Sequence, residues 1–161
     1  MKRAAVWLIL LVTFIGLADS AYLVKEKMLG NPLICNIEGL SGCNIVAQSP
    51  YADLWGIPVA AYGVAFYVLL FIVTAVELIY MSALVRRVIQ LLAVVGIIAS
   101  SYFMYIQIAI IDAFCIYCAV SALATFLIFV LAYFIEPLTA RRMLPPIQPP
   151  TRPEVALPPL S

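Results

Sequence analysis

Four long apolar segments constrain the fold of this chain more than any other feature. They run from about Ala4 to Val24, Pro58 to Met81, Val88 to Ile111 and Cys115 to Ile135. Each holds the roughly 20 apolar residues that a helix needs to cross a bilayer. The 161 residues are 66% hydrophobic and 11% charged, whereas a soluble domain is about half apolar and a quarter charged. Composition therefore excludes a water-soluble globule and favours an all-α membrane protein, a bundle of four transmembrane helices.

The basic residues predict the orientation of this bundle, because Lys and Arg in short loops remain on the cytoplasmic side. Seven of the nine lie at one end of the segments: Lys2, Arg3, Arg86, Arg87, Arg141, Arg142 and Arg152. The other end has only Lys25 and Lys27. We therefore expect both termini in the cytoplasm, with residues 25–57 and the turn around Asp112 facing outward. A secretory signal peptide is the alternative for the first segment, but that segment is long and lacks a clean cleavage site.

Proline divides the chain into two parts. Eight of the eleven prolines lie between residues 136 and 161. Such a composition favours extended polyproline conformations and builds no core. We expect a membrane domain at residues 1–135 and a disordered, proline-rich cytoplasmic tail at 136–161.

All four cysteines fall on the predicted outer side, and the chain has no histidine. Cys35 and Cys43 lie in the first outer loop, while Cys115 and Cys118 form a C-x-x-C where the last span begins. The lack of histidine excludes Ser-His-Asp and Cys-His catalysis. Disulfides persist on the outer face, and a helix N-terminus stabilises a thiolate. The pattern favours thiol–disulfide chemistry.

Three other interpretations of the cysteines remain. They are two structural disulfides, a four-cysteine zinc site, and inert packing. The spacing from Cys35 to Cys43 is long for a usual zinc knuckle, so we expect no metal. Four cysteines allow three pairings, and sequence alone does not choose among them.

The cysteines also belong to a wider pattern. Ser49 follows the second loop cysteine by six residues. Further elements are Gly16-Leu17, Ser20-Ala21-Tyr22-Leu23, Gly56-Ile57-Pro58 and Gly63. With the C-x7-C and C-x-x-C pairs, the chain resembles the vitamin K epoxide reductase (VKOR) family, specifically its prokaryotic members, over about residues 10–135.

The resemblance implies a four-helix bundle around a quinone, either menaquinone or ubiquinone, in the cell membrane. In the family, an extracytoplasmic thioredoxin-fold (DsbA-like) partner passes two electrons to the loop cysteines. The C-x-x-C takes them from the loop and reduces the quinone, which supports disulfide-bond formation. Carried over, Cys35 would meet the partner, Cys43 would exchange with Cys115, and Cys118 would face the quinone.

A quinone is a flat apolar ring with two carbonyl acceptors, so its pocket should be aromatic with one or two donors. The resemblance implies a hydroxyl near the quinone head at Ser49. The other candidates are Tyr51, Tyr62, Phe66, Phe103, Gln107, Ile111 and Phe114. Gln107 would bond either the quinone or a neighbouring helix, because an amide inside a bilayer is costly without a partner. Residues 45–55 are expected to form an amphipathic half-helix that closes the site.

The chain also departs from the family pattern. Val59 and Ala122 stand where the animal enzymes carry an asparagine and a tyrosine, which favours a plain quinone over vitamin K epoxide. Many bacterial members fuse a thioredoxin-like domain at the C-terminus, whereas here the proline-rich tail follows, so we expect a separate partner.

Three rival functions remain. A DsbB-like quinone reductase would have the two cysteine pairs in the reverse order. A non-catalytic four-span scaffold would have structural disulfides. A small transporter would use Asp19, Glu77 and Gln107 along its pathway.

Overall fold

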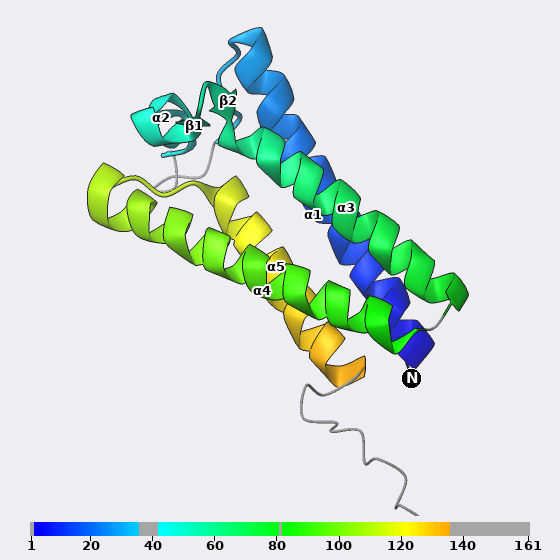
Figure 1. Cartoon of the computed structure of the whole chain (residues 1–161). Coiled ribbons are helices and arrows are strands. Elements are labelled where there is room, and N and C mark those ends of the chain that lie inside the picture. The colour runs from blue at the N-terminus through cyan, green and yellow to red at the C-terminus, as the bar shows by residue number, and fades with distance from the viewer. Residues whose placement is uncertain (1, 36–41, 81, 136–161) are drawn as a thin grey trace, which may run out of the picture.

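The structure is a computed structural model that describes residues 2–35, 42–80 and 82–135. Its four long helices are each apolar enough to span a membrane, and they run side by side (Figure 1). They are α1 (Lys2–Leu29), α3 (Val59–Tyr80), α4 (Ala83–Ile106) and α5 (Ile116–Ile135). The predicted four-helix membrane bundle is confirmed. The predicted tail, residues 136–161, lies outside the described residues.

The four long helices pack in a closed ring, in which each helix contacts two neighbours. Helix α1 contacts α3 and α5, and α4 contacts α5 and α3. Buried aliphatic and small residues fill the interior: Val6, Ile9, Leu70, Ile89, Ala93, Ala124, Ile128 and Ala132. The Tyr67 ring is buried among them, and its hydroxyl donates to the Ser121 carbonyl at 3.0 Å. Gly16 lies against this ring, so α1 and α3 approach closely, as small residues allow in membranes.

Two helix boundaries at one end of the bundle differ from those expected. Helix α1 continues past Val24 to Leu29, so the charges from Lys25 to Lys27 lie on its last turns. Lys and Glu are good helix formers, and hydropathy locates the membrane boundary rather than the helix end. Pro58, expected in the first turn of the next span, instead belongs to a short strand before α3.

At the opposite end, α4 begins earlier than the expected Val88. The Ser82 side chain caps the helix by accepting a hydrogen bond from the Leu84 N–H at 3.3 Å. Arg86 therefore lies inside the first turns of α4 and forms an ion pair with Glu77 of α3 at 2.9 Å. This pair joins α3 to α4 and gives the intramembrane carboxylate a structural partner.

A compact segment lies over one end of the bundle, between α1 and α3. It contains α2 (Cys43–Gln48), the 3-10 turn η1 (Pro50–Ala52) and the antiparallel strands β1 (Asp53–Leu54) and β2 (Ile57–Pro58). We call residues 42–58 the cap segment. The two residues of its hairpin turn, Trp55 and Gly56, have positive φ values of 53° and 77°, as type I′ turns require. Of the half-helix expected at residues 45–55, only the part up to Gln48 is α-helical, because η1, β1 and the hairpin turn follow it.

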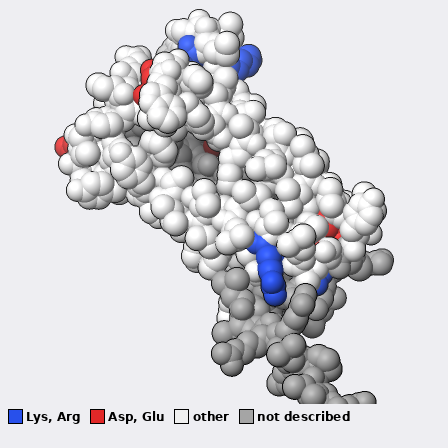
Figure 2. Space-filling view, in the orientation of Figure 1, with Lys and Arg blue, Asp and Glu red and all other residues white. Residues whose placement is uncertain are grey.

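The connection from α4 to α5 is a tight turn at the same end. A π-helical turn, η2 (Gln107–Ile111), extends α4, and Asp112 then adopts a left-handed conformation with φ 52°. Cys115 immediately precedes α5. Figure 2 shows charged side chains mainly toward the two ends of the visible face, with an uncharged belt between them.

Candidate redox site

The four cysteines gather at the end of the bundle that the cap segment covers. Cys35 and Cys43 form a disulfide, while Cys115 and Cys118 are free thiols. Cys43 and Cys115 are 0% and 2% exposed in one buried cluster, against which Cys35 and Cys118 pack. The pairing that the residues alone left open is thus Cys35 with Cys43. A disulfide packed against a dithiol is the arrangement that thiol–disulfide exchange requires.

Gly42 brings the two cysteine pairs into backbone contact. A Cβ atom at this position would lie 2.6 Å from the Phe114 nitrogen and 2.8 Å from its carbonyl oxygen. Only glycine therefore fits here without displacement. Because Gly42 precedes Cys43 and Phe114 precedes Cys115, the contact holds the loop disulfide beside the C-x-x-C.

Hydrogen bonds fix the chain just before Cys35 to the same place. The Asn44 side chain accepts from the Leu33 N–H at 2.7 Å and donates to the Leu33 carbonyl at 3.2 Å. The Ile34 N–H donates to the Tyr22 hydroxyl at 3.3 Å, and the Tyr117 hydroxyl donates to the Ile34 carbonyl at 2.8 Å. Tyr117 is the second variable residue of the C-x-x-C, so the motif itself forms a hydrogen bond with the loop that carries the disulfide.

The surroundings of Cys115 make its thiol more acidic than an ordinary cysteine. The hydrogen bond from the Cys118 thiol lowers the pKa of Cys115 to about 7, although burial opposes it, and the Cys118 and Tyr117 N–H groups add to the lowering. These are the unpaired donors of the first turn of α5, which stabilise a thiolate. Gln107 orients the group as well, because its Oε1 accepts from the Cys115 N–H at 3.1 Å.

This acidity can be measured in the reduced protein. We expect the ultraviolet absorbance of a thiolate to rise with pH around a midpoint near pH 7, because the lowered pKa of Cys115 leaves it half ionised there. The variant Cys118→Ala lacks the principal hydrogen bond, so its midpoint should move up toward the ordinary cysteine pKa of about 8.5. An unchanged midpoint in that variant would show that Cys118 does not acidify Cys115.

A cavity of about 650 Å³ lies beneath the cap segment. Its walls come from α1, the cap segment, α3, α4 and α5, and they include Cys43, Cys115 and Cys118. Figure 2 shows a hollow between the overhanging segment and the bundle. The volume is typical of pockets for small organic ligands.

Most of the residues predicted to bind a quinone lie on this one cavity. They are Ser49, Tyr51, Tyr62, Phe66, Phe103, Gln107 and Ile111. Phe114, also predicted to wall the quinone, is not among the lining residues, and its backbone packs against Gly42. Three charged residues line the cavity as well, namely Asp19, Lys27 and Asp53.

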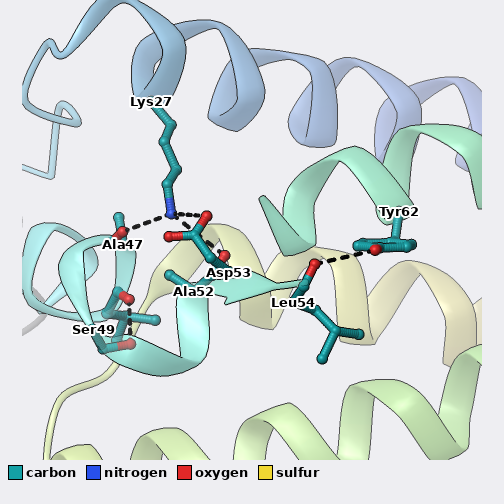
Figure 3. A network of polar contacts seen from close by, with 8 residues as sticks. Lys27, Ala47, Ser49, Ala52, Asp53, Leu54 and Tyr62 are labelled. Carbon is teal, nitrogen blue, oxygen red and sulfur yellow. Dashed lines mark hydrogen bonds and ion pairs between the residues drawn. The ribbon is translucent and has the colours of Figure 1, made fainter. Parts of the chain in front are cut away.

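The expected hydrogen-bond donors of the cavity already have protein partners. The Ser49 hydroxyl donates to the Val46 carbonyl at 2.8 Å, and the Tyr62 hydroxyl donates to the Leu54 carbonyl at 3.2 Å (Figure 3). The Gln107 side chain bonds Cys115, as above, and also the Cys118 sulfur. Gln107 therefore serves the C-x-x-C in this structure, while a rotation of the Ser49 hydroxyl would redirect its proton into the cavity.

Lys27 ties the cap segment to α1 (Figure 3). Its ammonium group lies 2.7 Å from an Asp53 carboxylate oxygen and donates to the carbonyls of Ala47 and Ala52 at 3.3 and 3.4 Å. One side chain thus joins α2, η1 and β1. The ion pair spans the edge of the cavity and holds its cover in place.

The variant Lys27→Met should loosen the cap segment without unfolding the bundle. Partly exposed ion pairs contribute up to about 1 kcal/mol, so we expect amide hydrogen exchange in residues 43–58 to accelerate by about two- to five-fold. Mass spectrometry of the exchanged protein measures this. Lys25→Met is the matched control, because the Lys25 side chain is 69% exposed and its ion pair, at 3.7 Å, is with the adjacent Glu26 and not with the cap segment. Equal exchange in both variants would contradict the assigned role of Lys27.

Sequence reasoning missed two parts of the site. It assigned no role to Asn44 or Tyr117, although each is directly adjacent to a redox cysteine in the chain. That adjacency was the available signal, and the polar contacts to Leu33 and Ile34 could not be read from it. Among the described residues, no group of three or more His, Cys, Asp or Glu side chains is placed to hold a metal ion.

Comparison with known proteins places the chain in a family. A search of curated proteins finds no significant match. The family model described as the vitamin K epoxide reductase family matches residues 7–133. The match extends from the first turns of α1 to the last turn of α5 and includes all four cysteines and the cap segment. The chain therefore belongs to the vitamin K epoxide reductase family of multi-pass membrane oxidoreductases.

Proposed function

We propose that the protein is a quinone-dependent thiol oxidoreductase that re-oxidises a separate extracytoplasmic thioredoxin-fold partner and so supports disulfide-bond formation. One observation carries the proposal. A loop disulfide, Cys35–Cys43, whose Cys43 end is buried, packs against a C-x-x-C dithiol that lines a mainly apolar, covered cavity.

Electrons would enter at the loop pair and leave from the C-x-x-C. After the partner's dithiol has reduced Cys35–Cys43, the Cys43 thiolate attacks Cys115 of an oxidised C-x-x-C and releases the Cys118 thiolate. Cys35 then attacks Cys43 of the mixed disulfide and releases Cys115. Two electrons have moved, and each disulfide broken is matched by one formed. The low pKa of Cys115 favours the second step, because a more acidic thiol leaves faster.

The state in the structure, a loop disulfide beside a C-x-x-C dithiol, corresponds to the end of that transfer. A non-catalytic scaffold would instead need stable disulfides at both pairs. The free thiols of the C-x-x-C therefore favour the catalytic proposal over the scaffold.

The cavity fits a quinone as the electron acceptor. Tyr51, Tyr62, Phe66 and Phe103 supply aromatic surface, and Ser49 supplies a hydroxyl. A bound quinone would supply a two-electron acceptor next to Cys118. Val59 lines the cavity with an apolar side chain, which supports a plain menaquinone or ubiquinone rather than an epoxide that needs an amide contact.

The proposed orientation places the cysteine-bearing end outside the cytoplasm. Arg86 and Arg87 lie at the opposite end, near the start of α4, as the distribution of basic residues on cytoplasmic loops requires. The proline-rich residues 136–161 follow α5 and would form a cytoplasmic tail.

The proposal is tested with purified protein, a small dithiol and a soluble quinone. We expect quinone reduction that depends on the protein, followed by the change in quinone absorbance. A wild-type protein that oxidises no dithiol in the presence of quinone would contradict the proposal.

A further inference from the structure

Asp19 of α1 is an unusual group in the cavity. The two other charged residues lining it, Lys27 and Asp53, pair with each other at 2.7 Å. Asp19 Oδ2 is buried and forms no hydrogen bond with any described residue. Asp19 is thus the one charged side chain on the described cavity wall that has a buried oxygen left without a partner.

A buried carboxyl oxygen without a partner is costly, because its desolvation is not offset by a hydrogen bond. A ligand in the cavity that forms a hydrogen bond with this oxygen would offset the cost. The carbonyl oxygen of a quinone accepts hydrogen bonds only, so it complements the O–H that a carboxylate carries once it has taken up a proton.

Asp19 also lines the same cavity as Cys115 and Cys118, and its charge raises the pKa of Cys115. The other titratable groups that sense it are Tyr67 of α3 and Tyr117 of α5. Lys27, on the same helix, is engaged by Asp53. Asp19 and the dithiol therefore border one ligand space.

We propose that Asp19 is a catalytic proton-transfer residue for reduction of the quinone by the C-x-x-C dithiol. This inference rests on the proposed function. The two sulfurs give up two electrons as the Cys115–Cys118 disulfide forms, and the quinone takes them up. The Asp19 carboxylate takes the proton of the Cys118 thiol and donates it to a quinone carbonyl oxygen. The proton that Cys115 releases to water is matched by the second proton that the quinol takes from water.

The variant Asp19→Asn tests this role because it keeps the size of the side chain and removes its acidic proton. With a small dithiol as donor, we expect kcat for quinone reduction to fall by about 10²-fold, a usual contribution of a general acid, and KM for the quinone to stay unchanged. Asp19→Glu should recover part of the rate. Asp112→Asn is the matched control, because Asp112 is near the C-x-x-C in sequence but exposed and outside the cavity lining.

A second measurement needs no quinone. In the reduced protein, removal of the Asp19 charge should lower the pKa of Cys115, because that charge raises it. Thiolate absorbance should therefore titrate at lower pH in Asp19→Asn than in Asp112→Asn. An equal titration shows that Asp19 does not sense the dithiol, and it overturns the inference.

The kinetic outcomes separate this inference from the proposed function. Normal kcat in Asp19→Asn, with an active wild type, would overturn the role of Asp19 and leave the proposed function standing. A higher KM with unchanged kcat would also overturn it, because Asp19 would then only bind the quinone. An inactive wild type would contradict both.

Discussion

Replacing Cys118 with alanine should abolish quinone reduction, with a loss of more than about 10³-fold, because removal of the reacting nucleophile leaves only residual rates. In the proposed route Cys118 is both the sulfur released when Cys43 attacks the C-x-x-C and the sulfur facing the quinone. Cys118 lines the cavity, whereas Cys35 does not. No other described thiol can replace it, since Cys115 would have no partner with which to form the product disulfide.

The measurement is the initial rate of quinone reduction with a small dithiol as donor. Val120→Ala is the control on the same helix, because Val120 is exposed on the surface of the bundle. The control should retain the wild-type rate, and thermal unfolding in detergent should be similar for both variants. Full turnover in Cys118→Ala would show that the C-x-x-C is not the electron donor to the quinone.

Replacing Cys43 with serine should separate the two halves of the route. Cys43 is 0% exposed and sits beside Cys115 through the contact of Gly42 with Phe114. Electrons from a thioredoxin-fold partner should no longer reach the quinone, because in the proposed route Cys43 forms the bond to Cys115. A small dithiol can reach Cys118, which is only partly buried and lines the cavity, and reduce the C-x-x-C directly, so quinone reduction from that donor should continue.

The rates with the thioredoxin-fold partner and with the small dithiol are measured on the same protein preparation, so each rate is the control for the other. Loss of the partner-driven rate by more than about 10³-fold, with the dithiol-driven rate within about threefold of wild type, is the expected result. If the partner still reduced the quinone through Cys43→Ser at an unchanged rate, the loop pair would not be the relay. A loss of both rates would mean that Cys43 is needed for the fold of the C-x-x-C region.

The helices of this protein could be predicted because each depends on local composition. Twenty consecutive apolar residues need a helix in a bilayer, and the four spans follow. Their ends could not be predicted as well. Residues 25–27 are charged and end the apolar segment, yet α1 continues through them. Arg86 lies within α4 because its charge is neutralised by Glu77 of α3, at a distance of 2.9 Å.

The candidate site divides in the same way. Cysteine spacing and the family pattern identified the thiols, and aromatic residues at helical spacing identified much of the cavity wall. Three other contacts depend on chain segments that meet only after folding. They are the backbone contact of Gly42 with Phe114, the hydrogen bonds of Asn44 with Leu33 and the ion pair of Lys27 with Asp53. The orphaned oxygen of Asp19 is likewise a property of its surroundings, which sequence does not describe.

Transfer of electrons along the whole route tests the central claim most directly. Purified wild-type protein is mixed with a reduced thioredoxin-fold protein and a soluble quinone, and both the new disulfide in the partner and the quinol are counted. The proposed function predicts one quinol for each partner disulfide, with both lost in Cys118→Ala. Oxidation of the partner without quinol formation, or no oxidation by the wild type, would contradict it.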